Sequence, residues 1–292
     1  MPDLSPSPVL LDPADVALGC ATLTEADLPE FIAVAARHGF RRISARPYSF
    51  LKALDDGHTE EGLQRALADA GVQVTVMDGL LRTLPGFRMP DASYSPPDLL
   101  RDMSEEEVFR SAEVLGAPIV NIPSPFCAAA PLEEIAGVVA GVCRRAAARG
   151  LLISLEFVPN SCLPSLAFTQ DVVAACGEPN CRITLDLFHH DRSGGTVDDI
   201  RRLPAGVIAA IHLSDRIRPT ADTAHVPHTG RCHPGEGELP LQELMAAALD
   251  NSPGAFVEIE VLNAELRSLT NDAAAARMAA GLAAWSRSSA GR

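Results

Sequence analysis

The chain has 292 residues, of which 47% are hydrophobic and 21% are charged, so it can form one large domain or two smaller ones. Its 38 acidic residues exceed its 24 basic residues, and the formal net charge is −14. This balance argues against nucleic acid and anionic membranes as partners, because both attract cationic surfaces. No stretch approaches the roughly 20 uninterrupted apolar residues of a membrane span.

The first 15 residues are expected to form an irregular N-terminal segment, and they lack the basic start and apolar run of a signal peptide. The seven cysteines include no CxxC pair, so we expect neither a disulfide framework nor a zinc knuckle. Together these features predict a reduced, cytoplasmic protein.

Eight short runs rich in apolar and β-branched residues are typical of strands. In chain order they are Val16–Cys20, Arg41–Ala45, Val72–Asp78, Pro118–Ile122, Leu151–Phe157, Arg182–Leu187, Val207–Leu213 and Ala255–Leu262. Helical patterns follow each of them. They cover Glu25–His38, Thr59–Ala70, Ser104–Leu115, Leu132–Arg149, Leu166–Cys176, Val197–Leu203, Leu241–Asp250 and Asp272–Trp285.

Eight strand–helix units in a chain of this length predict an α/β fold, a (β/α)8 TIM barrel in a single domain over residues 1–292. A doubly wound open sheet is the alternative. It is disfavoured because the turn after the first strand has no GxGxxG pattern and no GxxxxGK[ST] pattern occurs in the chain. In a barrel the active site lies at the carboxyl ends of the strands, where the eight βα loops meet.

Ionisable residues stand near the carboxyl ends of four successive strands. Side chains of a strand alternate between its two faces, so an apolar set such as Ile183, Leu185 and Leu187 leaves the intervening residues facing the barrel interior. By this alternation the inward residues near the strand ends are Glu156, Asp186, His212 and Glu260. Glu258 also faces inward, one layer deeper.

Three converging carboxylates are costly to bury without a counterion, and no Lys or Arg stands beside them on the inner faces of these four strands near their carboxyl ends. A divalent cation held by all four residues resolves this problem. Carboxylate and imidazole ligands suit Mn²⁺, Mg²⁺, Co²⁺ or Zn²⁺, and the oxygen-rich set favours Mn²⁺ or Mg²⁺.

At these residues the sequence resembles the xylose isomerase-like TIM-barrel superfamily, in its sugar phosphate isomerase/epimerase branch with inosose dehydratases and ketose 3-epimerases. The segments that carry the resemblance are LEFVPNSCLP, LDLFHHDRSGG, IHLSD, GRCHPGEGELPL and VEIEVLNAEL, which lie between Leu151 and the C-terminus. The resemblance implies that Glu156, Asp186, His212 and Glu260 are metal ligands. The last strand of the family ends in a sequence pattern that this chain matches from Glu260 to Leu266. The resemblance therefore implies that Glu260, and not Glu258, is the ligand.

The resemblance further implies substrate-binding roles for His189, Arg218 and Arg231. One position departs from it, since ketose 3-epimerases carry a second glutamate where this chain has Cys162. The loops after the first four strands are expected to set specificity. Candidate lining residues there are Arg46, Tyr48, Asp78, Arg82 and Phe126.

A site of this kind predicts abstraction of a proton next to a carbonyl, with Glu156 and Glu260 as the acid/base pair. The expected function is a metal-dependent isomerase or epimerase of a sugar or sugar-like polyol ketone that acts through an enediolate. The alternatives are a lyase of the inosose- or 3-dehydroshikimate-dehydratase type, a catalytically inactive binding barrel and a metal-dependent endonuclease. The expected partner is a small polyhydroxylated substrate, and the resemblance implies a homodimer or homotetramer.

Overall fold

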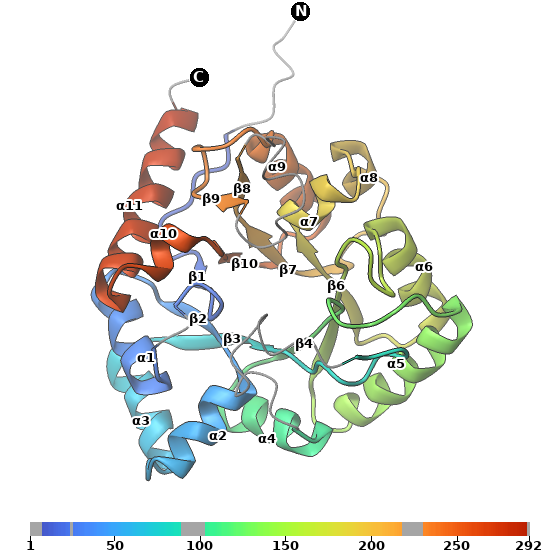
Figure 1. The fold of residues 1–292 in the computed structure, drawn as a ribbon, viewed down its shortest axis with the longest axis horizontal. Helices are drawn as coiled ribbons and strands as arrows, with labels where there is room; N and C mark the ends of the chain where they lie inside the picture. Colours follow the sequence, from blue (N-terminus) through green and yellow to red (C-terminus); the bar gives the residue numbers. More distant parts are fainter. Residues whose placement is uncertain (1–7, 24–25, 89–102, 218–229, 291–292) are drawn as a thin grey trace, which may run out of the picture.

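The computed structural model describes residues 8–23, 26–88, 103–217 and 230–290. Eight parallel strands close into a barrel in the order β1-β10-β7-β6-β5-β4-β3-β2, and helices surround it (Figure 1). The prediction of a (β/α)8 TIM barrel is therefore confirmed. The barrel strands are β1 Ala17–Leu18, β2 Arg42–Ala45, β3 Gln73–Asp78, β4 Ile119–Pro123, β5 Leu152–Glu156, β6 Cys181–Asp186, β7 Ile208–Leu213 and β10 Phe256–Ile259.

Capping residues explain where several of the helices begin and end. Thr59 and Ser104 cap α3 and α4 by accepting backbone N–H groups, and Gly116 and Gly177 end α4 and α6 in the left-handed conformation that glycine favours. The helices are α1 Leu28–Arg37, α2 Pro47–Asp55, α3 Glu60–Ala70, α4 Glu105–Leu115, α5 Leu132–Ala147, α6 Leu166–Cys176, α7 Leu187–Arg192, α8 Val197–Arg201, α9 Leu241–Asn251, α10 Ala264–Arg267 and α11 Asn271–Ala290.

Several elements differ from the sequence expectation. The loop after the second strand, where no helix was predicted, contains α2, which Pro47 starts at a position where the missing N–H costs nothing. The sixth strand passes directly into α7, with Asp186 as the cap. In the long loop after β7, the short strands β8 (Asp215–Arg216) and β9 (Arg231–Cys232) pair as a two-stranded antiparallel sheet.

The barrel interior is layered along its axis. A small group of apolar residues packs within it, among them Val76, Ile119 and Ala210. A polar layer that includes Asn121 and Thr184 lies further along, at full burial. Beyond this polar layer, at the carboxyl ends where the loops gather, lie the acidic side chains of Glu156 and Asp186.

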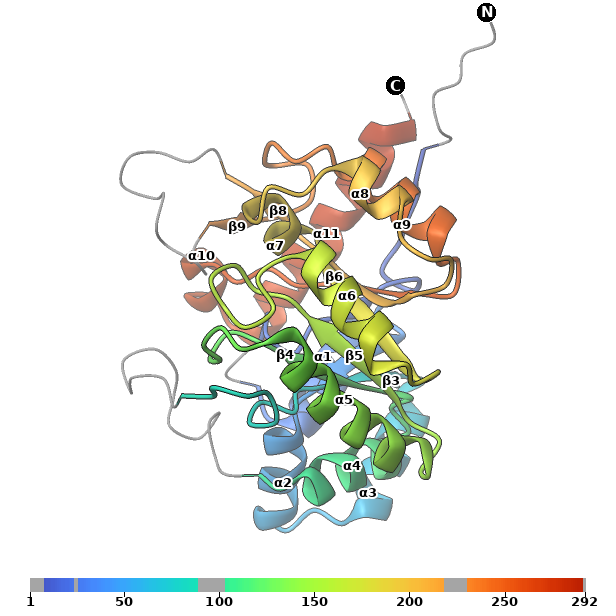
Figure 2. The same ribbon diagram turned by 90° about the vertical axis from the view of Figure 1, so that its right-hand side faces the viewer.

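Figure 2 shows the barrel from the side, with α5 and α6 neighbouring each other on its outer surface. Most of the apolar core lies between the strands and this outer layer of helices, as expected for this fold. Within the described residues, no helix is both long enough and apolar enough to cross a membrane.

Candidate metal centre and active site

Four ionisable side chains meet at the carboxyl ends of adjacent strands. Glu156 ends β5, Asp186 ends β6, His212 lies in β7 and Glu260 directly follows β10. Each offers one potential ligand atom, and these atoms all lie within 4.8 Å of one another. All four residues are at most 6% exposed. We call these four residues the carboxylate–histidine cluster.

The imidazole of His212 presents its two nitrogens to different carboxylates. Nδ1 lies 3.3 Å from Glu156 Oε1, 3.6 Å from Glu260 Oε2 and 3.9 Å from Asp186 Oδ2. Neither ring nitrogen makes a hydrogen bond to any residue that the structure describes. A fully buried nitrogen that faces three carboxylates without a hydrogen bond is placed as a metal ligand would be.

Asp186 uses its two oxygens for different contacts. Oδ1 accepts the backbone N–H of His189 at 2.9 Å and so caps α7. Oδ2 accepts a hydrogen bond of 2.7 Å from Arg231 Nη2. Asp186 therefore fixes the start of the helix that carries His189 and also takes part in the cluster.

Arg231 supplies a positive charge that the sequence argument did not count. It comes from β9, not from a barrel strand, and is 2% exposed. Its guanidinium contacts Asp186 and lies 3.2 Å from Glu260 Oε2, while its Cζ lies 4.6 Å from the ring centre of Phe188. The structure therefore adds a counter-charge that the inner faces of the strands do not supply, because this loop arginine pairs with two of the three carboxylates.

A buried asparagine that the sequence analysis did not select orients Glu156. Asn121 Nδ2 donates to Glu156 Oε2 at 2.7 Å and to Asp78 Oδ1 at 2.9 Å. Its Oδ1 accepts the hydroxyls of Ser154 and Thr184, each at 3.0 Å. Strand alternation applied to β4 would have identified Asn121 as inward-facing.

Glu258 lies behind His212, one layer deeper in the barrel. Its Oε1 accepts a hydrogen bond of 2.7 Å from the Ser44 hydroxyl, and its Oε2 lies 4.0 Å from His212 Nε2. A carboxylate behind a ligating imidazole is a common way of fixing the ring's orientation. Gly19 allows this arrangement, because a Cβ at this position would lie 2.8 Å from Glu258 Oε1.

Burial and neighbouring charges shift the pKa values of these groups in different directions. Burial lowers the pKa of His212, but the charges of Glu156, Glu260 and Glu258 outweigh it and raise the pKa well above its usual value. Burial raises the pKa of Glu258 to about 8. Burial also raises the pKa of Asp186, yet the charges of Arg231, His189 and His212 hold it below its usual range.

A cavity of about 170 Å³ opens beside the cluster. Glu156, Glu260 and the predicted substrate-binding residues His189 and Arg231 line it. Other lining residues come from the loops that were expected to set specificity: Arg46, Tyr48, Asp78 and Phe126. His189 is 6% exposed, and burial, assisted by Arg231, lowers its pKa.

Three other residues from the sequence analysis are outside this cavity or outside the described ranges. Arg82 does not line it and lies over the ring of Phe87. Cys162 is buried in the loop after β5, where its N–H donates to the carbonyl of Cys127. Arg218 falls within residues 218–229, outside the described residues.

The donor set of the cluster fits a divalent cation. Three carboxylates and one imidazole offer oxygen and nitrogen ligands at one point, and no hydrogen bond from the described residues to the His212 nitrogens would have to be displaced by an ion. Such ligands suit Mn²⁺, Mg²⁺, Co²⁺ or Zn²⁺.

The family model of the xylose isomerase-like TIM barrel matches residues 32–288. This chain belongs to that family. The resemblance seen in the sequence is thereby confirmed.

Two curated relatives carry the name inosose isomerase. The one from Halalkalibacterium halodurans is 23% identical over 205 residues, which cover 69% of this chain and 63% of the relative, so the match spans less than two thirds of its length. The one from Bacillus velezensis is 21% identical over 258 residues, which cover 85% of this chain and 88% of the relative.

Solved structures share the fold at lower identity. An IOLI protein with a binding zinc atom matches with a TM-score of 0.79 at 18% identity, covering 94% of this chain and 99% of its own. A probable 3-DHS dehydratase from Bacillus anthracis matches with a TM-score of 0.70 at 17% identity, and the match covers 89% of this chain and 97% of the dehydratase chain. A D-psicose 3-epimerase matches with a TM-score of 0.68 at 15% identity, and the match covers 95% of this chain and 100% of the epimerase chain. The named relatives and these named neighbours include isomerases, an epimerase and a dehydratase.

Proposed function

We propose that this chain is a divalent-metal-dependent isomerase or epimerase of a sugar or sugar-like polyol ketone, acting through an enediolate. The observation that carries the proposal is the convergence of Glu156, Asp186, His212 and Glu260 beside a cavity. Membership of the xylose isomerase-like family supports it, and so does the name of the two curated relatives.

All four residues of the carboxylate–histidine cluster would hold the ion, with Mn²⁺ or Mg²⁺ favoured by the oxygen-rich set. When bound, the ion supplies a Lewis acid that stabilises negative charge on the substrate oxygens. In the proposed reaction Glu156 and Glu260 are the acid/base pair that takes a proton from the substrate carbon and returns one to it. β6 and β7 separate the strands that carry them, so the two carboxylates approach the substrate from different sides.

One glutamate removes the proton next to the carbonyl. Return of the proton to the same carbon from the other face gives an epimer, whereas return to the neighbouring carbon gives an isomer. Asn121 keeps one oxygen of Glu156 engaged and leaves Oε1 directed towards His212 and the site. Arg231 Nη1 lies 3.2 Å from Glu260 Oε2 and holds that carboxylate by an ion pair.

His189 and Arg231 are the proposed substrate-binding residues within the described part of the chain, and Arg218 remains a proposal of the same kind. A neutral His189 at the cavity wall both donates and accepts hydrogen bonds, as substrate hydroxyls require. A cavity of about 170 Å³ suits a small polyol rather than a polymer.

The deciding experiment is solvent deuterium incorporation, followed by NMR in D₂O with Mn²⁺ and a panel of ketoses, inososes and 3-dehydroshikimate. Glu156→Gln and Glu260→Gln should each abolish incorporation into the substrate that the wild type accepts. Glu243→Gln, an exposed glutamate on α9, should leave it unchanged. Retained exchange in both active-site variants would overturn the acid/base assignment.

A lyase on the same site is the second candidate. The observation that favours it is Cys162, which stands where ketose 3-epimerases carry a second glutamate and which is 1% exposed. Loss of a β-hydroxyl from the same enediolate gives a dehydratase, so the product mass would fall by one water. A protein that binds no Mn²⁺ would instead favour a catalytically inactive barrel.

A further inference from the structure

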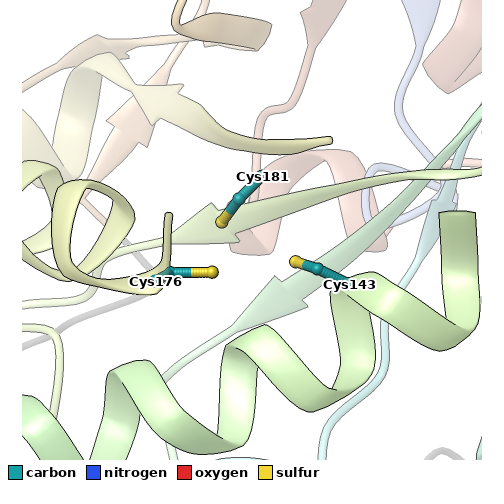
Figure 3. A group of neighbouring side chains, drawn as sticks. All are labelled: Cys143, Cys176 and Cys181. Carbon is teal, nitrogen blue, oxygen red and sulfur yellow. The ribbon is translucent and has the colours of Figure 1, made fainter. Parts of the chain in front are cut away.

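Three cysteines converge at the end of the barrel opposite the active site. Cys143 lies on α5, Cys176 is the last residue of α6 and Cys181 is the first residue of β6. Their sulfurs all lie within 4.8 Å of one another, and Figure 3 shows the three side chains pointing towards a common point. We call these residues the cysteine cluster.

The backbone around the cysteine cluster is held in place by hydrogen bonds. Gly177 ends α6 in the left-handed conformation, and the N–H of Cys181 donates to the carbonyl of Glu178, so a tight turn separates Cys176 from Cys181. Asn180, in the same turn, donates its side-chain N–H to the carbonyl of Cys143 at 2.8 Å. The three thiols are therefore brought together by a fixed turn and not by flexible chain ends.

The spacing of the sulfurs matches what one ion requires. A metal–thiolate bond of about 2.3 Å places three sulfurs around an ion about 4 Å apart. The thiols already lie close to this separation, and all seven cysteines of the chain are free rather than joined in disulfides. Closing around an ion would need only a small inward movement.

The donor atoms of the cysteine cluster are of a different kind from those of the carboxylate–histidine cluster. In the described part of the chain no histidine or carboxylate joins the three sulfurs as a fourth ligand. Glu178, the acidic residue of the turn, pairs with Arg144 at 2.7 Å. Three sulfur ligands select soft ions, whereas Mg²⁺ and Mn²⁺ prefer oxygen.

We propose that Cys143, Cys176 and Cys181 form a second metal site, which binds one soft, thiophilic d¹⁰ cation through three thiolates. On binding, three S–H bonds break, three protons pass to solvent and three metal–sulfur bonds form, with no change of oxidation state. Cu(I) is the biological ion that best suits three sulfur ligands, because structural Zn²⁺ sites are almost always four-coordinate.

The position of the site predicts what the ion does. β6 carries Cys181 at its start and Asp186 at its end, so five residue steps of about 3.3 Å place the two clusters about 16 Å apart. The amino-terminal face of a TIM barrel contributes to stability rather than to chemistry. The ion therefore joins α5, α6 and β6 and stabilises the fold. Cys176 is 8% exposed, which leaves a short route to solvent.

The test uses Cd²⁺ with the full-length, fully reduced protein, because thiolate ligands to Cd²⁺ give an ultraviolet charge-transfer absorption that oxygen and nitrogen ligands do not give. The wild type should develop this absorption up to one equivalent of Cd²⁺, and its melting temperature should rise by several degrees. Cys143→Ser, Cys176→Ser and Cys181→Ser should each strongly weaken the absorption. The triple variant should lose the absorption and show a smaller rise of melting temperature than the wild type, because only the carboxylate–histidine cluster is left to bind Cd²⁺.

The matched control is the double variant Cys127→Ser/Cys162→Ser, which removes the other close pair of cysteines and should keep the absorption and the stabilisation. Far-ultraviolet circular dichroism checks that every variant is folded. Cu(I), supplied under anaerobic conditions, should compete with Cd²⁺ for the site. An unresponsive wild type, or an absorption that survives in the triple variant or vanishes in the control, would overturn the proposal. None of these outcomes bears on the proposed isomerase activity.

Discussion

Asn121 Nδ2 lies 2.7 Å from Glu156 Oε2, and this hydrogen bond fixes one oxygen of the proposed catalytic glutamate. The same amide nitrogen also binds Asp78, so a single buried side chain sets the distance between two acidic residues of the cavity. This contact can be identified only from the structure, because Asn121 and Glu156 stand on neighbouring strands and are far apart in sequence.

Replacement of Asn121 by Ala should therefore weaken both Mn²⁺ binding and turnover, by about 10- to 100-fold, because Glu156 loses its fixed orientation. Isothermal titration with Mn²⁺ and deuterium exchange into substrate measure the two effects. Asn271→Ala, at the start of α11, serves as the control. An Asn121→Ala enzyme with wild-type affinity and rate would show that Glu156 needs no such support.

Removal of divalent ions by a chelator should lower the melting temperature and abolish activity, and Mn²⁺ should restore both. Asp186→Asn is the informative variant, since asparagine also caps helices and so preserves α7 while the charge is lost. We expect the variant to fold but to show no rise of melting temperature with Mn²⁺. An unchanged response to Mn²⁺ in differential scanning fluorimetry would argue that Asp186 is no ligand.

Arg231→Ala should destabilise the protein by about 3–5 kcal/mol in the absence of divalent ions, because Asp186 and Glu260 lose a buried counter-charge. Added Mn²⁺ should recover part of this loss by supplying positive charge at the same place. Urea unfolding with and without Mn²⁺ measures both effects. Arg231→Lys should not restore the wild-type stability, because lysine cannot make the forked contacts of the guanidinium.

Gly19→Ala should destabilise the fold by about 1–3 kcal/mol, because a Cβ there would lie 2.8 Å from both Glu258 Oε1 and the carbonyl oxygen of Ile259. Gly137→Ala is the matched control, since a Cβ at this position on α5 meets nothing within 4 Å. In a helix this change should be neutral or stabilising by about 0.5–1 kcal/mol. Equal effects of the two changes in chemical denaturation would contradict the steric argument.

The barrel and the carboxylate–histidine cluster could be predicted from the sequence because both follow from local regularities. Alternation along a strand assigns each residue to a face, and the end of a strand marks the end of the barrel. Those two rules alone selected Glu156, Asp186 and His212, which the structure brings together with Glu260. What the four residues bind remains a prediction.

The features that could not be predicted depend on how distant segments pack. Arg231 was a substrate-binding candidate, but its ion pairs with Asp186 and Glu260 could not be predicted, because it reaches the cluster from a loop whose path no periodicity describes. α2 follows from Pro47 in a segment where no helix was predicted. The cysteine cluster could not be predicted because a strand and a helix separate Cys143 from Cys176 and Cys181 in the chain. Spacing rules predict metal sites from cysteines that are close in the sequence. They do not detect cysteines that come together because two helices pack against each other.

Asp186 has a consequence for any attempt to redesign this barrel. Its two oxygens serve the start of α7 and the proposed ion site at once, so a change that retunes metal preference also shifts the helix that presents His189 to the cavity. Selectivity for a new substrate is therefore best sought in the loop residues Arg46, Tyr48 and Phe126, which line the cavity without contributing to the carboxylate–histidine cluster. Mutational libraries confined to those loops should retain far more active clones than libraries that include position 186.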